Sequence, residues 1–209
     1  MKKEKIIQQG AEAVIIQKDN KIIKRRVSKS YRIKELDEKI RNRRTRSEAK
    51  ILEKASKIIF SPKVLNIDEN KKEITMELLK GKKLSEHLQD FSFSQQKQIF
   101  EKIGENIGKL HSQDIIHGDL TLANMILKSP EQIFFIDFGL SFISQKIEDC
   151  AVDLHLFKES LKASYPEMSQ DFFQSVAKGY SSIKSSSKNK TPLVLQQILK
   201  VEKRGRYKN

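Results

Sequence analysis

Two short segments place three polar side chains at intervals that phosphoryl-transfer chemistry uses. HGDLTLANMI begins at His117 and sets Asp119 five residues before Asn124, and the apolar run FFIDFG ends in Asp137 and Gly139, with Asp137 eighteen residues after Asp119. In sites that hold a nucleoside triphosphate, this spacing is typical of one Asp that orients the attacking hydroxyl and of two magnesium ligands. Asp-Phe-Gly alone is weak evidence for such a site, because an Asp and a Gly after a strand often form an ordinary turn. The two segments together are specific.

Each of the three side chains can be given a role. Transfer or hydrolysis of a γ-phosphoryl group needs alignment and charge neutralisation more than covalent chemistry from the protein. Asp137 is therefore predicted to ligate the magnesium that bridges the β and γ phosphates, and Asn124 to hold a second metal ion. Asp119 is predicted to accept a hydrogen bond from the attacking hydroxyl or water. The alternative for both Asp residues is a satisfied turn or cap.

A strand must also supply a cation for the α and β phosphates. Lys24 follows the apolar Ile22 and Ile23 and is predicted to fill this role. Arg25 and Arg26 are adjacent competitors. Because side chains alternate along a strand, Arg25 is expected to point away from the face that carries Lys24.

A carboxylate is expected to hold the Lys24 ammonium in place. Glu48 is the predicted partner, since it lies on the helix that follows the strand and begins an apolar helical run. Glu53 and Glu35 are weaker alternatives. An exposed helical Glu without a partner is the plain reading of any of the three.

Two further segments are candidates for nucleotide contacts. QGAEAV, from Gln9, is a poor glycine loop, so backbone cover over the phosphates would rest on the residues Gly10, Ala11, Glu12 and Ala13. In ITMELL, Met76 is expected to border the adenine, and the backbones of Glu77 and Leu79 to face its edge. An ordinary turn and a core methionine are the alternatives.

The surrounding pattern predicts two lobes. VIIQKDNKIIK reads as a hairpin around Asp19-Asn20, and about 34 to 59 as a long basic helix with Asn42 as a candidate break point. VLNID and EITMELL read as strands, and Ser92 opens a capping box before a helix that ends near His111. Helices are expected over 151–165, over 169–180 and from about Pro192. The prediction is an α+β, minimal bilobal fold, with a β-rich N-lobe over 1–80, a helical C-lobe over 81–202 and a basic tail over 203–209.

Composition limits the remaining choices. The 209 residues include 41 Lys or Arg, 27 Asp or Glu and one cysteine, Cys150, so no intramolecular disulfide can form. No apolar leader or membrane-length apolar run is present, and a cytoplasmic location, or a nuclear one in a eukaryote, is expected. Residues 1–60 carry 19 basic and 8 acidic side chains, and residues 178–209 carry 9 and 1. This distribution suits a polyanionic partner, although a solvated Lys-rich surface is the alternative.

Taken together, the segments resemble the protein kinase superfamily and, within it, the small atypical kinases of the KEOPS complex. The likeness covers nearly the whole chain and rests on QGAEA, IIKRRVSKSYR, RNRRTRSEAKIL, HGDLTLANM, IDFGLSFIS, the VDL that ends at Leu154, and the terminal KRGR. It implies ATP and Mg²⁺ as cofactors, weak Ser/Thr kinase activity with autophosphorylation, and an ATPase role beside a threonylcarbamoyl transferase subunit and other KEOPS subunits. That assembly is associated with threonylcarbamoyladenosine formation in tRNA. Carried over by motif, the roles of Lys24, Glu48, Asp119, Asn124 and Asp137 are those given above.

Departures from ordinary protein kinases argue against a peptide kinase. Gly118 stands where the HRD arginine is usual, and Thr121 where a phosphate-contacting Lys is usual. Only thirteen residues separate Gly139 from Asp153, which leaves no room for a long activation segment. Asp153 is expected to brace the catalytic loop by accepting backbone hydrogen bonds, with a helix N-cap as the alternative.

Three functions from different classes remain open. The leading one is a nucleotide-hydrolysing kinase-fold subunit of a tRNA-modifying assembly. A self-standing protein or small-molecule kinase is the second, and a pseudokinase scaffold is the third. Contacts with tRNA are expected from a basic helix and from the tail, through Arg41, Arg43, Arg44, Arg46, Lys203, Arg204, Arg206 and Lys208. Autophosphorylation is expected on Ser181, Ser182, Ser185, Ser186 or Ser187.

Overall fold

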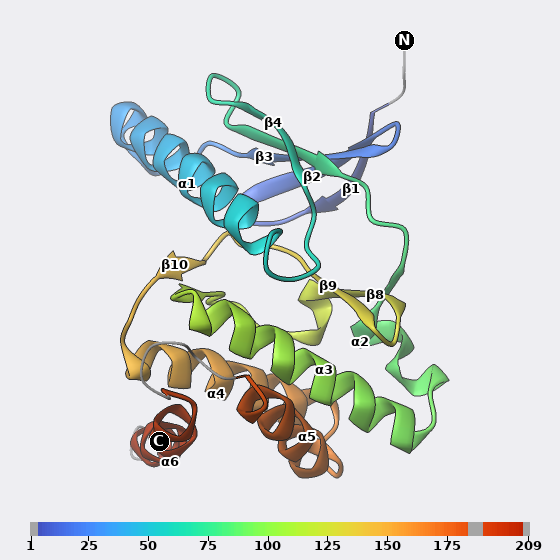
Figure 1. Cartoon of the computed structure of the whole chain (residues 1–209). Coiled ribbons are helices and arrows are strands. Elements are labelled where there is room, and N and C mark those ends of the chain that lie inside the picture. The colour runs from blue at the N-terminus through green and yellow to red at the C-terminus, as the bar shows by residue number, and fades with distance from the viewer. Residues whose placement is uncertain (1–3, 184–189, 207–209) are drawn as a thin grey trace. The chain divides into compact units, whose positions relative to one another are not determined.

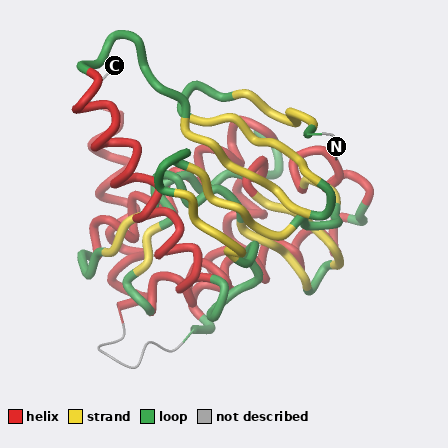
Figure 2. Tube along the Cα trace, turned by 90° about the horizontal axis from the view of Figure 1, so that it is seen from above, coloured by secondary structure: helices red, strands yellow, loops and turns green. Residues whose placement is uncertain are grey.

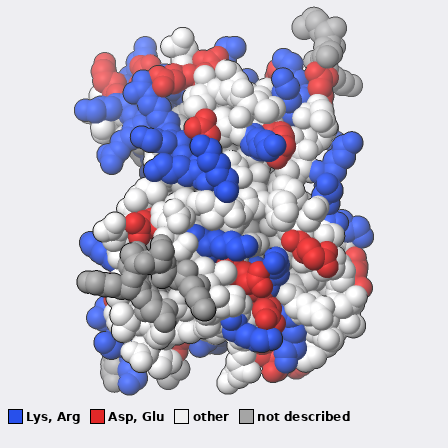
Figure 3. Space-filling view, viewed as in Figure 1, with Lys and Arg blue, Asp and Glu red and all other residues white. Residues whose placement is uncertain are grey.

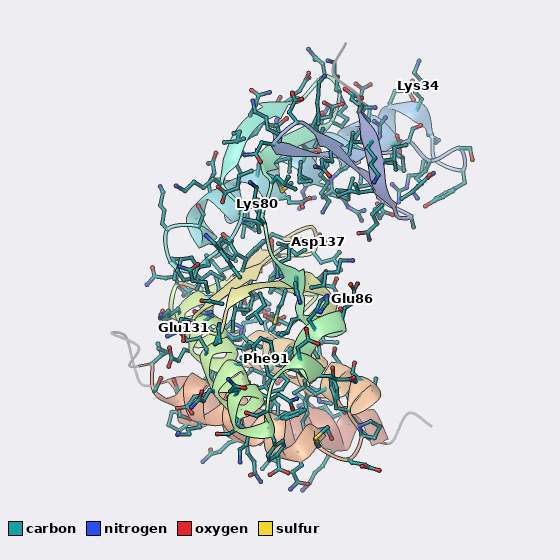
Figure 4. The ribbon with its side chains drawn as sticks, turned by 90° about the vertical axis from the view of Figure 1, so that its right-hand side faces the viewer. Lys34, Lys80, Glu86, Phe91, Glu131 and Asp137 are labelled. Carbon is teal, nitrogen blue, oxygen red and sulfur yellow. The ribbon has the colours of Figure 1, made fainter. Side chains whose placement is uncertain are left out.

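The computed structural model describes residues 4–183 and 190–206, and their contacts divide the chain into two compact units. Unit 1 comprises Met1–Lys57 and Ser61–Lys80, and unit 2 comprises Ile58–Phe60 and Gly81–Asn209. The last boundary between the two units along the chain falls between Lys80 and Gly81, where the sequence analysis places the junction between the lobes. Figure 4 marks Lys80, the last residue of unit 1. Within the described ranges, no helix is both long enough and apolar enough to cross a membrane.

Unit 1 is a twisted five-stranded sheet with one long helix. The order is β1-β2-β3-β5-β4, every neighbouring pair is antiparallel, and Figure 2 shows the strands side by side. Asp19 adopts a φ of 53° in the turn between the second and third strands, a conformation that Asp tolerates better than most residues. The predicted hairpin is therefore present. The elements are β1 (Lys5–Gln9), β2 (Ala13–Lys18), β3 (Lys21–Arg26), α1 (Lys34–Ala55), β4 (Val64–Asp68) and β5 (Glu73–Glu77).

Helix α1 lies beside this sheet (Figure 1), and one face of the helix is buried. Its C-terminal half is held by apolar side chains, and its N-terminal half by Asp37, which accepts hydrogen bonds from the Lys29 backbone and from Arg41. The helix is continuous through Asn42, where the sequence suggested a break. Contacts on both sides of Asn42 outweigh the modest helix preference of that residue.

Unit 2 is mainly helical and carries two short sheets, with strand orders β6-β8-β9 and β10-β7. The Ser92 hydroxyl accepts from the Gln95 backbone N–H, and the Ser92 backbone N–H donates to the Gln95 side chain, so the predicted capping box starts α3. The elements are β6 (Lys82–Lys83), α2 (Leu84–His87), η1 (Leu88–Asp90), α3 (Phe93–Ser112), β7 (Ile115–Ile116), η2 (Leu122–Asn124), β8 (Met125–Ser129), β9 (Gln132–Phe135), β10 (Phe142–Ile143), α4 (Ile147–Ser164), α5 (Ser169–Ser181) and α6 (Lys190–Arg206).

The core of unit 2 lies among α3, α4 and α5, which Figure 1 shows grouped together. Phe100 stacks at 4.4 Å, centroid to centroid, on Phe172, and both rings are fully buried. At the crossing of α3 and α5, a Cβ on Gly104 would lie 2.0 Å from a carbonyl oxygen of α5, and one on Gly179 would lie 1.8 Å from the Glu101 carbonyl oxygen. Only glycine allows the two helices to approach this closely.

Two features differ from the sequence-based expectations. Helix α6 continues to Arg206, so residues 203–206 extend a helix where a tail was expected, and residues 207–209 lie outside the described part. The serines at 185, 186 and 187 also lie outside the described residues.

The second difference concerns residues 58–60, which belong to unit 2. The Phe135 backbone N–H donates to the Phe60 carbonyl at 2.9 Å, and the Phe60 ring lies 5.3 Å from that of Phe134.

Candidate functional site

In unit 1, Lys24 and Glu48 form a buried ion pair. Lys24 is 7% exposed on β3, Glu48 is 3% exposed on α1, and Lys24 Nζ lies 2.6 Å from Glu48 Oε1. Inside the protein, a cation and a hydrogen bond take the place of the water that would otherwise surround this carboxylate. The pair therefore fixes the end of the Lys24 side chain on one face of the sheet.

The neighbouring arginines take opposite faces of β3. Arg25 is exposed and its Nε lies 2.5 Å from Glu73 Oε1, whereas Arg26 is 5% exposed and its Nη2 donates to Glu48 Oε2. Alternation along the strand thus separates Arg25 from Lys24, as expected, and returns Arg26 to the Lys24 face. One carboxylate oxygen of Glu48 therefore contacts Lys24, and the other contacts Arg26. The sequence presents Arg26 as a rival of Lys24, although the same alternation could have identified it as a second partner of Glu48.

The loop before β2 is held by hydrogen bonds of its own. The Gly10 N–H donates to the Ala13 carbonyl at 2.9 Å, and Lys29 Nζ donates to the Ala11 carbonyl. Glu12 is exposed and its Oε2 lies 2.5 Å from Arg44 Nη1 on α1. The Gly10 N–H is therefore engaged within the turn, and a phosphate would need another donor here. The predicted phosphate-contacting role of this loop has no support from its hydrogen bonds.

The segment at the end of β5 is tied to the chain that leads into β4. The Glu77 N–H donates to the Lys63 carbonyl at 3.1 Å, and Glu77 Oε1 accepts from the Lys63 N–H at the same distance. The Glu77 N–H is thus engaged within unit 1 rather than directed at a purine edge. Met76 pairs with Ile22 and Val64 in the sheet and is half-buried, and Leu79 follows the strand. The adenine-facing roles of these residues stay predictions.

In unit 2, Asp119 and Asn124 are joined directly. Asn124 Nδ2 donates to Asp119 Oδ2 at 2.8 Å and to the Asp119 backbone carbonyl at 2.9 Å. The amide nitrogen faces Asp119, which directs the amide oxygen of Asn124 away from the carboxylate. A carboxylate that orients a hydroxyl and an amide oxygen that can ligand a hard cation thus sit side by side.

His117 connects this loop to the end of β9. Its Nε2 lies 3.2 Å from the Ile136 carbonyl, and its Nδ1 accepts from the Asp119 backbone N–H at 3.3 Å. Nδ1 must be unprotonated to accept, so Nε2 carries the proton. Burial lowers the pKa of His117, which keeps the ring neutral in spite of the nearby carboxylates. Asp119 and the residue before Asp137 are therefore tied to one ring.

Asp153 braces the same loop from α4. Its two carboxylate oxygens accept the backbone N–H groups of His117 at 2.9 Å and Gly118 at 2.8 Å, and it is 1% exposed. Gly118 has a φ of 79°, and a Cβ there would lie 2.5 Å from the Leu140 carbonyl oxygen. An arginine at this position would be strained and would clash. The glycine is thus required by the backbone.

Asp137 follows β9 with a φ of 62°, a left-handed conformation that is uncommon for a residue with a side chain. Its Oδ1 accepts the Gly139 N–H at 3.2 Å, and Figure 4 labels it on the loop after the strand. Sparsely populated backbone conformations of this kind cluster at functional sites. Asp137 is exposed, and its carboxylate oxygens are ligands of the kind that a hard divalent cation prefers.

A buried charged pair lies behind the loop. His111 Nε2 is 3.1 Å from Asp153 Oδ2, and His111 Nδ1 is 3.0 Å from the Tyr180 hydroxyl. Burial disfavours the charged ring, but the hydrogen bonds with Asp153 and Cys150 outweigh burial and raise the pKa of His111 to about 9. Burial likewise opposes ionisation of Asp153, whose pKa is nevertheless lowered by His111. His111 is absent from the sequence-based site, because a lone His on a helix gives no signal of its own.

The structure thus brings the predicted residues into two groups: Lys24 with Glu48 in unit 1, and Asp119 with Asn124 in unit 2, tied through His117 to the strand before Asp137. These arrangements can hold a cation against phosphate oxygens and orient a hydroxyl.

Comparisons with known proteins give a consistent result. Residues 1–163 match the protein kinase domain. Over 98% of its length the chain is 37% identical to a KEOPS complex subunit Bud32 of Pyrococcus abyssi, of which 96% is covered. It is 38% identical over 95% of its length to a probable serine/threonine-protein kinase BUD32 homolog of Archaeoglobus fulgidus, of which 94% is covered. It is also 41% identical to a probable bifunctional tRNA threonylcarbamoyladenosine biosynthesis protein of Methanosphaera stadtmanae, but spans only 36% of that protein.

Proposed function

Because the chain belongs to the protein kinase family and, within it, to the group of Bud32-type kinases, we propose that it uses magnesium-ATP as the ATPase and kinase subunit of a KEOPS-type assembly. The enzyme class, an atypical Ser/Thr kinase and ATPase, follows from the family. The nucleotide, the metal, the individual partners and the residue roles are the proposed parts.

Lys24 is assigned to the α and β phosphates. A lysine ammonium that is pinned by a buried Glu is a positioned point charge, and it can stabilise negative charge on the nucleotide without reorganising. Glu48 does not touch the nucleotide in this scheme and acts by orienting Lys24. The pair lies wholly within unit 1, so it is formed independently of any bound ligand.

Asp119, Asn124 and Asp137 are assigned to the reacting end of the nucleotide. Asp119 accepts a hydrogen bond from the attacking hydroxyl or water, which aligns that oxygen with the γ-phosphorus. The Asn124 amide oxygen and the Asp137 carboxylate are hard oxygen donors and would hold magnesium. Bound there, magnesium would neutralise charge on the phosphate oxygens. The observation that carries this proposal is the Asn124–Asp119 hydrogen bond, because it sets two of the three side chains in one rigid loop.

The partner is proposed to be a threonylcarbamoyl transferase subunit, together with other subunits of the same assembly. In the Methanosphaera relative, a segment like this chain makes up 36% of a protein that is named bifunctional and is linked by its name to tRNA threonylcarbamoyladenosine biosynthesis. The remaining length of that protein lies outside the match to this chain, and we assign its second function to that part. A separate chain with that function is therefore the proposed partner here, and a cytoplasmic location accords with a tRNA substrate.

A basic row on α1 supports a contact with tRNA. Lys39, Arg43, Arg46, Lys50 and Lys54 recur every three or four residues, and all five are exposed. They share one helix face about 22 Å long, and Figure 3 shows Lys and Arg gathered where Figure 1 draws α1. Arg41 and Arg44, which the sequence also suggested, contact Asp37 and Glu12, and Arg46 within the row contacts Glu69. The row can follow a line of phosphates.

The catalytic assignment is tested by ATP hydrolysis. Asp137→Ala and Asn124→Ala should each abolish turnover, because each removes an oxygen donor for the metal. Lys128→Ala, an exposed change on β8, is the matched control. Turnover should be measured with and without the transferase subunit and tRNA. Hydrolysis in Asp137→Ala at the wild-type rate would refute the assignment, and partner-independent turnover would favour a self-standing kinase.

The tRNA contact is tested by a salt series. A triple change of Lys39, Arg43 and Lys50 to Gln leaves Arg46 with its partner Glu69. It should flatten the slope of log affinity against log salt by roughly 0.7 to 0.9 for each phosphate that is no longer neutralised. A triple change of Lys97, Lys128 and Lys162 to Gln removes the same charge from unit 2. Equal effects of the two triple variants would show that only net charge matters and would reject the row as a docking surface.

A further inference from the structure

We propose that Arg26 is a positioning residue for Lys24, acting through Glu48. This inference rests on the proposed function, since it concerns how the phosphate-contacting lysine is held. Arg26 Nη2 donates to Glu48 Oε2 while Lys24 Nζ bonds Glu48 Oε1, and all three side chains are buried on one face of β3 and α1. The carboxylate therefore lies between two cations and cannot rotate without breaking one contact.

The Arg26 contact has the features of a fixed support. Arg26 sits two residues from Lys24 on the same strand, and its backbone N–H donates to the Lys72 carbonyl at 3.0 Å. Its guanidinium is planar and always charged, so its hydrogen bond to a carboxylate is more directional than that of a lysine. The guanidinium contacts Glu48 through its terminal nitrogen Nη2, and the buried Nε has no hydrogen-bond partner among the described residues.

Two consequences follow for Lys24. Without Arg26, Glu48 Oε2 would lose its buried hydrogen-bond donor, and the carboxylate would be free to change rotamer. With Arg26 present, one Glu48 oxygen is held by the guanidinium, and the other is kept in position for the Lys24 ammonium. The support lies within unit 1 and requires no phosphorylated segment.

Alternation along β3 supplies a matched control. Arg25 carries the same charge, lies one residue away and pairs with Glu73, but it points to the other face and is 44% exposed in its side chain. Arg25→Gln should leave turnover within about twofold of wild type. Arg26→Gln should lower kcat about tenfold or more, with a smaller effect on KM. Arg26→Lys, which keeps one cation near Glu48, should recover part of the loss.

A double-mutant cycle separates positioning from folding. If Arg26 acts through Glu48, Arg26→Gln should reduce kcat by less than about twofold in a Glu48→Gln background. Thermal unfolding and binding of magnesium-ADP by calorimetry are measured for every variant, and Arg26→Lys carries the comparison if Arg26→Gln does not fold. Additive losses from the two changes, or wild-type kcat in the Arg26 variants that fold, would overturn the proposal. A wild-type chain without turnover in the full assembly would instead reject the proposed function.

Discussion

The His111–Asp153 pair makes the stability of unit 2 depend on pH in a defined direction. His111 has an ordinary pKa of 6.5, raised to about 9 in the folded chain. A group whose folded pKa is raised contributes its full stabilisation below about pH 6.5, and that contribution is lost as pH rises through about 9. At about 1.4 kcal/mol per pH unit, the interval corresponds to roughly 3 kcal/mol.

The assay is urea unfolding, followed by far-UV circular dichroism between about pH 6 and about pH 9.5, which stays below the ordinary tyrosine pKa of about 10. Wild-type unfolding free energy should fall by a few kcal/mol across this range. In His111→Gln most of that fall should disappear, because no titrating ring remains beside Asp153. His87→Gln, a change at a half-buried residue on α2, should keep the wild-type slope.

One neighbour must be separated from His111. Cys150 is a buried hydrogen-bond partner of the ring, so its contribution to the profile is measured separately. Cys150→Ala should therefore retain most of the wild-type pH dependence. A flat wild-type profile, or a slope that survives in His111→Gln and vanishes in Cys150→Ala, would refute the charged pair.

Three other outcomes are expected. Gly118→Ala should cost about 1 to 3 kcal/mol of unfolding free energy and most of the turnover, because its Cβ meets the Leu140 carbonyl; a silent variant would mean that the backbone there is not constrained. Lys24→Ala should weaken turnover far more than Arg25→Ala, and the reverse order would place the wrong face of β3 at the nucleotide. Deletion of residues 203–209 should reduce the salt dependence of tRNA affinity; an unchanged slope and affinity would leave this segment without a phosphate contact.

Much of unit 1 could be predicted because its signals are local. The turn at Asp19, the alternation of β3 and the apolar run after Glu48 each act within a few residues. The same is true of the capping box of α3. The Lys24–Glu48 ion pair followed from these local patterns plus the chemistry that a phosphate-binding lysine requires, although its catalytic role stays a prediction.

The rest depends on contacts between residues far apart in sequence. Strands β6, β7 and β10 have two residues each, too few to show a period. The charge state of His111 depends on Asp153, which lies on another helix. No sequence pattern near His111 predicts this contact. The glycine loop is a different case: a family pattern placed Gly10 at a phosphate, its N–H is used within the turn, and the phosphate-contacting role of the loop stays a prediction.

The place of residues 58–60 affects how this protein can be divided. These three residues follow α1 in sequence but belong to unit 2, where Phe60 bonds to β9. The chain therefore passes between the units three times, and neither unit is a continuous stretch. A fragment that ends at Lys80 would include residues 58–60, which belong to unit 2. A fragment that begins at Gly81 would lack Phe60, whose carbonyl accepts the Phe135 N–H. Gene-splitting, domain-swap and limited-proteolysis experiments on this protein should treat it as one inseparable piece.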